Sequence, residues 1–219
     1  MKIQRSLLPH VCQPRRSFLA AGAMAGAILT FPQLALAGKL LGVASEVYVN
    51  GKRAYRGATI RPGDVVKTGG LSEAVFVVGK DAFMLRERSE MRLLGPQRGT
   101  TRIAAGLRVL TGGLLSVFGS GERKLVTSTA TAGIRGTGVY VEVSSELTYF
   151  CTCYGAVELA DSSGSETRQV SAIHHEAHTV HAEPQVGSVF EPATMRNHYD
   201  EELRLLENLV GREPPFMAG

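Results

Sequence analysis

The chain has 219 residues, 44% hydrophobic and 20% charged, which is enough to bury the core of one ordinary domain and excludes a disordered chain. Its formal net charge of +4 suggests a nucleic-acid-binding protein, but four basic residues and no acidic ones lie in residues 1–37. Subtracting these four from 24 basic residues leaves 20, which balance the 20 acidic residues. A neutral domain offers no basic patch to a phosphate backbone, so a nucleic-acid partner is excluded.

Residues 1–37 have the features of a twin-arginine signal peptide. RRSFL at 15–19 precedes an uncharged Ala/Gly-rich run, and ALA at 35–37 forms an A-x-A cleavage site. We therefore predict a periplasmic protein, exported by the twin-arginine route, with no membrane span after cleavage. The alternative is an uncleaved N-terminal anchor, because the uncharged run from 17 to 38 is about long enough to cross a bilayer.

From residue 39 to about residue 180 the pattern is that of β-strands. Short runs of Val, Tyr, Phe, Leu and Thr are broken by Gly, Asp and Asn. Asn50-Gly51 and residues 79–81 are predicted to close two hairpins, since Asn-Gly readily takes the positive φ of a two-residue turn. Further strands are predicted at 107–110, 114–118, 125–128, 139–143 and 147–153. Many short strands with frequent turns indicate a sandwich, barrel or solenoid.

Residues 192–210 change to a helical period. Apolar residues at 195, 199, 203, 206 and 210 fall on one face of an α-helix. Pro192 suits its first turn, and Gly211 suits the position after its end. We predict a helix packed on the β domain, with a partner-binding helix as the alternative. The predicted division is a signal peptide at 1–37, a β domain at 38–182, and a linker with a helix at 183–219.

Three stretches resemble the FecR-type domain, which is named for a regulator of ferric-citrate transport. They are RGATIRPGDVVKTG at 56–69 with SEAVF at 72–76, LTGGLLS at 110–116, and TAGIRGTGVYV at 131–141 with YGAV at 154–157. The resemblance covers roughly residues 42–160. It implies a periplasmic, mainly β module, a FecR-like β-sandwich or β-solenoid of many short strands, that recognises a ligand or a protein partner in the envelope.

The same resemblance sets limits on the expected activity. In the best-known members, a cytoplasmic anti-sigma domain and a transmembrane helix precede the module, and a C-terminal part meets an outer-membrane receptor. Only 14 residues precede Arg15, so we do not carry the regulator's activity over. The glycines at 133, 136 and 138 are interpreted as structural, because no GK[ST] follows them and they lead into a strand rather than a helix.

Soft metal ligands gather in two places. Cys151 and Cys153 occupy alternate positions of a strand-like run, so both thiols point to one face. Residues 174–181 read HHEAHTVH, in which Thr179 prevents an H-E-x-x-H motif and excludes a zinc protease. If 173–181 is a strand, His174 and His178 share one face, and His175 and His181 the other. Pairing of this strand beside the cysteines would give a Cys₂His₂-type set.

We therefore predict a metal site, with Cys151, Cys153, His174 and His175 as favoured ligands and His178 and His181 as reserves. Zinc, copper and iron, including iron–sulfur centres, all accept such ligands, and the metal stays open. Two alternatives remain. One is a strained, redox-active disulfide between the two cysteines, and the other is inert structure with buried thiols and solvated imidazoles. His198 is assigned to the helix and left out of the site.

The sequence contains no recognised catalytic motif. It lacks G-x-S-x-G and paired carboxylates in a known context, and two cysteines on one strand suit Cys–His nucleophilic catalysis poorly. We therefore expect no enzyme. Two functions remain: a periplasmic FecR-like protein that binds or senses a metal, or a metal-free interaction or signalling module that meets an envelope partner through its β surface and helix.

Overall fold

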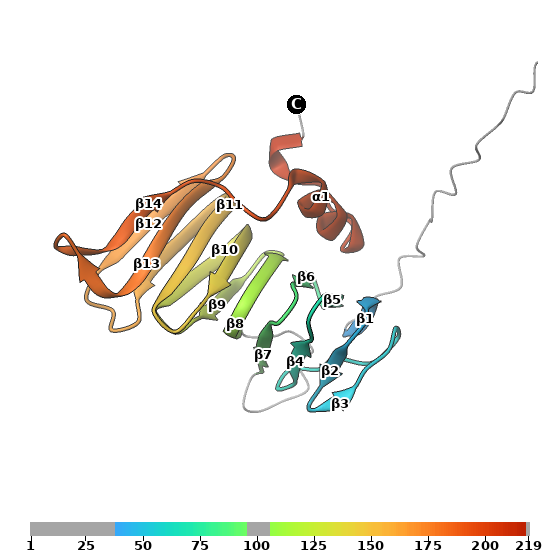
Figure 1. The fold of residues 1–219 in the computed structure, drawn as a ribbon. Coiled ribbons are helices and arrows are strands. Elements are labelled where there is room, and N and C mark those ends of the chain that lie inside the picture. The colour runs from blue at the N-terminus through green and yellow to red at the C-terminus, as the bar shows by residue number, and fades with distance from the viewer. Residues whose placement is uncertain (1–37, 96–105, 218–219) are drawn as a thin grey trace, which may run out of the picture. The chain divides into compact units, whose positions relative to one another are not determined.

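The computed structural model describes residues 38–95 and 106–217 (Figure 1). The predicted signal peptide therefore lies outside the described residues. The elements, in chain order, are β1 (Lys39–Ala44), β2 (Val47–Val49), β3 (Lys52–Arg53), β4 (Val65–Thr68), β5 (Glu73–Val78), β6 (Asp81–Leu85), β7 (Glu90–Leu94), β8 (Gly106–Val117), β9 (Glu122–Val126), β10 (Ala130–Val143), β11 (Leu147–Asp161), β12 (Thr167–Ala172), β13 (Glu176–Gln185), β14 (Ser188–Ala193), α1 (Asp200–Leu209) and the 3₁₀ turn η1 (Pro215–Met217). None of the helices in the described ranges is long and apolar enough to cross a membrane.

Fourteen strands form one open hydrogen-bonded sheet, which confirms the predicted mainly β fold with a C-terminal α-helix. The main strand order is β14-β13-β11-β10-β9-β8-β7-β4-β2-β3. Strands β1, β5 and β6 join this path through β8, and β12 joins it through β11. All pairs are antiparallel except β8 with β9.

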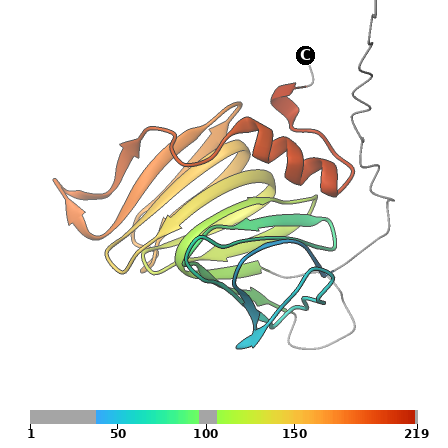
Figure 2. The same ribbon diagram turned by 45° about the vertical axis from the view of Figure 1, so that its right-hand side comes forward.

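Three long strands bend and carry the chain from one part of the sheet to another. They are β8, β10 and β11, with 12, 14 and 15 residues, longer than the short strands predicted. Each contains a glycine with positive φ, namely Gly112, Gly136 and Gly155. Near these glycines the strands change partners: β10 pairs with β9 before its bend and with β8 after it. Figure 2 shows the long strands curving.

The bent sheet buries two hydrophobic clusters, one on each face. The inner cluster is the larger and includes stacked Phe76 and Phe83, whose ring centroids are 5.1 Å apart. The outer cluster includes residues of β6, β8, β10 and β11 together with the leucines of α1. Because side chains alternate along a strand, Phe150 enters the inner cluster while Cys151 and Cys153 enter the outer one. The predicted same-face placement of the two thiols is correct.

The two predicted hairpins are present. Asn50 and Gly51 both take positive φ between β2 and β3, and Val78 pairs with Asp81 at the turn between β5 and β6. Both turns follow the local sequence signals directly.

The predicted helix packs on the sheet but begins eight residues later than Pro192. Pro192 lies in β14, where it pairs with His178 of β13, and strand structure therefore continues to Ala193. Leu203 and Leu206 are fully buried, as the helical period indicates. Met195 and Tyr199 precede α1, whose first residue is Asp200, and both are exposed.

Candidate metal centre

Four side chains from three segments meet on the outer face of the sheet. Cys151 and Cys153 come from β11, His175 comes from the turn before β13, and His198 comes from the segment before α1. One ligand atom of each lies within 4.8 Å of the other three. We call these four residues the Cys/His cluster.

Three of the six distances between ligand atoms of the cluster are close to those of a tetrahedral metal site. Cys151 Sγ lies 3.6 Å from His175 Nδ1, Cys153 Sγ lies 3.4 Å from His198 Nε2, and the two nitrogens are 3.1 Å apart. A tetrahedral zinc ion with bonds of about 2.3 Å to sulfur and about 2.05 Å to nitrogen requires S···N edges of about 3.5 Å and N···N edges of about 3.3 Å. The observed separations match these edges to within a few tenths of an ångström.

The backbone at His175 brings this side chain into the cluster. His175 has a φ of 48°, and its N–H donates to the carbonyl of Cys153 at 2.9 Å. Strand β13 begins only at Glu176. The alternation expected for a strand over 173–181 therefore does not hold at its start, and His174 and His175 both reach Asp200 instead of pointing to opposite faces.

Both cluster imidazoles are oriented by acceptors behind them. His175 Nε2 lies 2.8 Å from a carboxylate oxygen of Asp200, and His198 Nδ1 lies 2.7 Å from the carbonyl oxygen of Arg196. Since each of these nitrogens donates its hydrogen outward, the neutral forms of the two imidazoles present the lone pairs of His175 Nδ1 and His198 Nε2 to the cluster. Such an outer hydrogen bond to a carboxylate or carbonyl accompanies nearly every metal-binding histidine.

The two thiols share their charge unequally. Cys153, followed by the imidazoles of His175 and His198, lowers the pKa of Cys151 against the opposing effect of burial. Burial, followed by the neighbouring Cys151, raises the pKa of Cys153 well above its ordinary value. For His175, burial lowers the pKa, but the Cys151 and Asp200 contacts outweigh it and raise the pKa overall. Because metal ligands must be deprotonated, metal binding to both cysteines would release protons.

The cluster is closed to solvent. Cys151 and Cys153 are fully buried, His198 is 1% exposed, and the side chain of His175 is 6% exposed. A buried set of four protein ligands is typical of structural zinc sites, whereas catalytic sites leave one position for water or substrate.

The other histidines predicted as ligands lie outside the Cys/His cluster. His174 contacts Asp200 at 2.9 Å and so supports the carboxylate that orients His175. His178 pairs with Phe150, on the face opposite to the cysteines, and burial lowers its pKa. His181 pairs with Leu147, further along the strand, and its side chain contacts Glu191 at 3.1 Å.

Sequence reasoning missed His198. It was assigned to a helix that in fact begins two residues later, and it reaches the cluster from 45 residues beyond Cys153. One signal in the sequence could have found it. Proline is tolerated in an edge strand, and Pro192 lies in the edge strand β14. A strand at Pro192 requires a connecting segment before the helix, and His198 lies in that segment.

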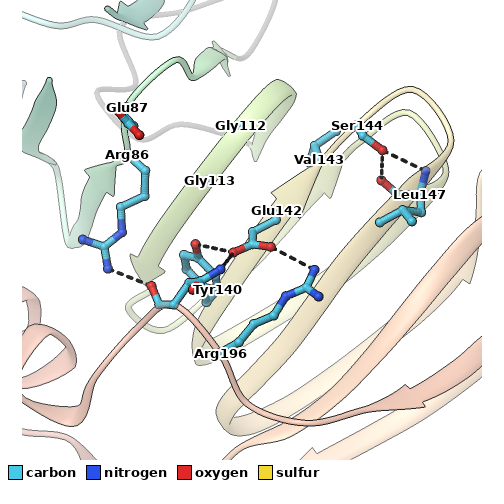
Figure 3. Close-up of a pocket in the computed structure, with 11 residues that line it drawn as sticks. Arg86, Glu87, Gly112, Gly113, Tyr140, Glu142, Val143, Ser144, Leu147 and Arg196 are labelled. Carbon is cyan, nitrogen blue, oxygen red and sulfur yellow. Dashed lines mark hydrogen bonds and ion pairs between the residues drawn. The ribbon is translucent and has the colours of Figure 1, made fainter. Parts of the chain in front are cut away.

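A pocket of about 430 Å³ is lined by Tyr140, Glu142 and Arg196 among others (Figure 3), and by Asn197, the residue before His198 of the cluster. Arg196 and Asn197 both contact the carboxylate of Glu142, which also lines the pocket. The ring of Tyr140, which also lines the pocket, stacks on the imidazole of His198 with centroids 4.6 Å apart. The segment that supplies the fourth ligand therefore also shapes this pocket.

Comparisons with known proteins give the following. No protein-family model and no curated protein matches the chain. Two crystal structures of a "putative anti-sigma factor" from Parabacteroides distasonis, at 1.65 and 2.50 Å resolution, are similar with a TM-score of 0.48 and 13% sequence identity. The similarity covers 59% of this chain and 59% of each of the other two.

Proposed function

We propose that this chain is an exported, FecR-like envelope protein that binds a single zinc ion through Cys151, Cys153, His175 and His198. The observation that carries the proposal is the meeting of four buried ligand atoms within 4.8 Å of one another, with the two imidazole nitrogens 3.1 Å apart beside two thiols. A metal ion held by all four atoms would satisfy these buried polar groups together.

Zinc fits this ligand set better than the other metals considered. A tetrahedral site with two sulfur and two nitrogen ligands is typical of zinc, whereas copper(II) prefers a tetragonal arrangement. A two-iron cluster with two cysteines and two histidines places each ligand pair on a different iron, with sulfides between them. Four ligand atoms within 4.8 Å of one another support a single ion instead.

The role we propose is binding and interaction, not catalysis. The four buried side chains would fill the coordination sphere of zinc and leave no position for a substrate. The FecR resemblance supports an envelope protein partner. Two of its motifs pack together, since a Cβ on Gly138 would lie within 3.0 Å of the ring of Tyr154. This contact supports a structural role for Gly138.

Elemental analysis tests the metal site directly. The protein is exported in its natural host and purified without a chelator or a histidine tag. We expect about one zinc ion per chain, lost in Cys151→Ser and in His198→Ala. His181→Asn is the matched control, because it removes a histidine of the same sheet face outside the cluster, and it should retain zinc. No stoichiometric metal in the natural chain, with both thiols free, would favour the metal-free interaction module.

Cell fractionation tests the proposed export. Replacing both Arg15 and Arg16 with lysine should leave the chain in the cytoplasm, because the twin-arginine route reads that pair. The exported natural chain should begin at Gly38, which intact-mass measurement detects. Recovery of the doubly substituted chain from the periplasm would contradict the route, and an uncleaved membrane-bound chain would support the anchor.

A further inference from the structure

The fourth ligand lies on a segment that covers the outer face of the sheet. We call residues 194–217 the C-terminal segment. Its helix α1 buries Leu203 and Leu206 against the outer cluster, where the side chains of Tyr140 and Tyr149 also lie. Figure 2 shows α1 lying beside the curved strands. The outer cluster depends on this segment for part of its cover.

The polar contacts of the segment are of two kinds. Glu207 of α1 is buried, accepts a hydrogen bond from Tyr154 of β11 and pairs with Arg212. The other ion pairs are partly exposed. Arg86 pairs with Glu202 at 2.6 Å, and Arg196 pairs with Glu142 at 2.9 Å. Ion pairs that water reaches contribute little to docking, because solvent screens them. Moreover, α1 has only ten residues, and an isolated helix of that length is marginal in water. The helix therefore depends on tertiary contacts for its order.

The Cys/His cluster is the point at which a metal would change this balance. Three of the four ligands lie in the β domain: Cys151, Cys153 and His175. The fourth, His198, belongs to the C-terminal segment, as does Asp200, which orients His175. With an ion bound, the coordinating nitrogen of His198 forms a bond that ties the segment to the ligands of the β domain. Without an ion, that bond is absent, and the cluster holds the segment only through weaker contacts such as that between His198 Nε2 and His175 Nδ1 at 3.1 Å.

We propose that metal occupancy controls whether the C-terminal segment stays docked on the sheet. This inference rests on the proposed zinc site and adds its regulatory consequence. Loss of the metal releases the C-terminal segment and uncovers the apolar surface around Tyr140, Tyr149 and Leu115. It also opens the pocket, because Arg196 and Asn197, which line it, leave with the segment. The protein then presents a different face to an envelope partner.

Hydrogen exchange followed by mass spectrometry tests the coupling in the exported chain. The same preparation is measured loaded with zinc and after removal of zinc by a chelator. We expect amides of α1 to exchange about tenfold faster or more without zinc, while those of β10 keep their protection. Trypsin cleavage after Arg204, an exposed residue of α1, provides a second measurement and should accelerate in parallel.

Variants separate the two proposals. Zinc-loaded His181→Asn should behave as the natural chain, whereas His198→Ala should show fast exchange in α1 whether or not zinc is added. If about one zinc binds per chain but α1 exchanges equally in both forms, the coupling is wrong and the site stands. If no zinc binds, the proposed function itself fails. If β10 also loses protection on zinc removal, the metal supports the whole domain, which contradicts a segment-specific control.

Discussion

Replacing Asp200 with asparagine should weaken zinc binding without abolishing it. The Asp200 carboxylate accepts hydrogen bonds from His175 at 2.8 Å and from His174 at 2.9 Å, but it is not among the four clustered ligands. Loss of such an outer partner typically costs 10–100-fold in metal affinity, equivalent to about 1.4–2.7 kcal/mol. An asparagine oxygen still accepts one hydrogen bond but lacks the charge that strengthens the basicity of the imidazole.

Competition with a chromophoric chelator at fixed pH and ionic strength measures this loss. Glu201→Gln is the matched control, because Glu201 is exposed in the same first helical turn and carries the same charge near the helix N-terminus. It removes the same favourable interaction with the helix dipole but touches no cluster residue. An affinity equal to that of the control would refute the orienting role of Asp200. Complete loss of zinc, as expected for His198→Ala, would show instead that Asp200 is itself a ligand.

Three further substitutions test the fold that supports the site, each by urea unfolding of the zinc-loaded chain. Leu206→Ala should lower the free energy of unfolding by about 2–5 kcal/mol, because this side chain of α1 is fully buried against the sheet. Gly155→Ala should lower the free energy of unfolding more than Gly164→Ala. Both glycines have positive φ, where an alanine costs about 1–2 kcal/mol, but only at Gly155 would the new Cβ meet neighbouring atoms. Equal costs would refute crowding at the β11 bend. Asp81→Ala should lower the free energy of unfolding by about 3–5 kcal/mol, since it leaves the buried Arg123 guanidinium without its carboxylate partner at 2.8 Å. A decrease of less than about 1 kcal/mol would contradict this.

Much of the fold follows from local sequence. Asn50-Gly51 predicts its hairpin because few residues tolerate positive φ at two successive positions. Leu203 and Leu206 predict a packed helical face because of their spacing. What local sequence did not reveal is that β8, β10 and β11 run unbroken through glycines. A glycine with positive φ ends one strand in a hairpin and only bends another, and which of these occurs depends on the partner strands available on each side.

The candidate site divides in the same way. The sequence by itself determined that Cys151 and Cys153 share a face, because side chains alternate along any strand. It also determined that histidines follow close behind them. Only the tertiary structure decided which imidazoles face the thiols. His175 does so because its positive φ lets the backbone depart from strand geometry, and His198 does so because the chain after β14 crosses back over β11. Ligand choice depends on contacts between residues 24 to 45 positions apart, and no periodicity within a segment encodes such contacts.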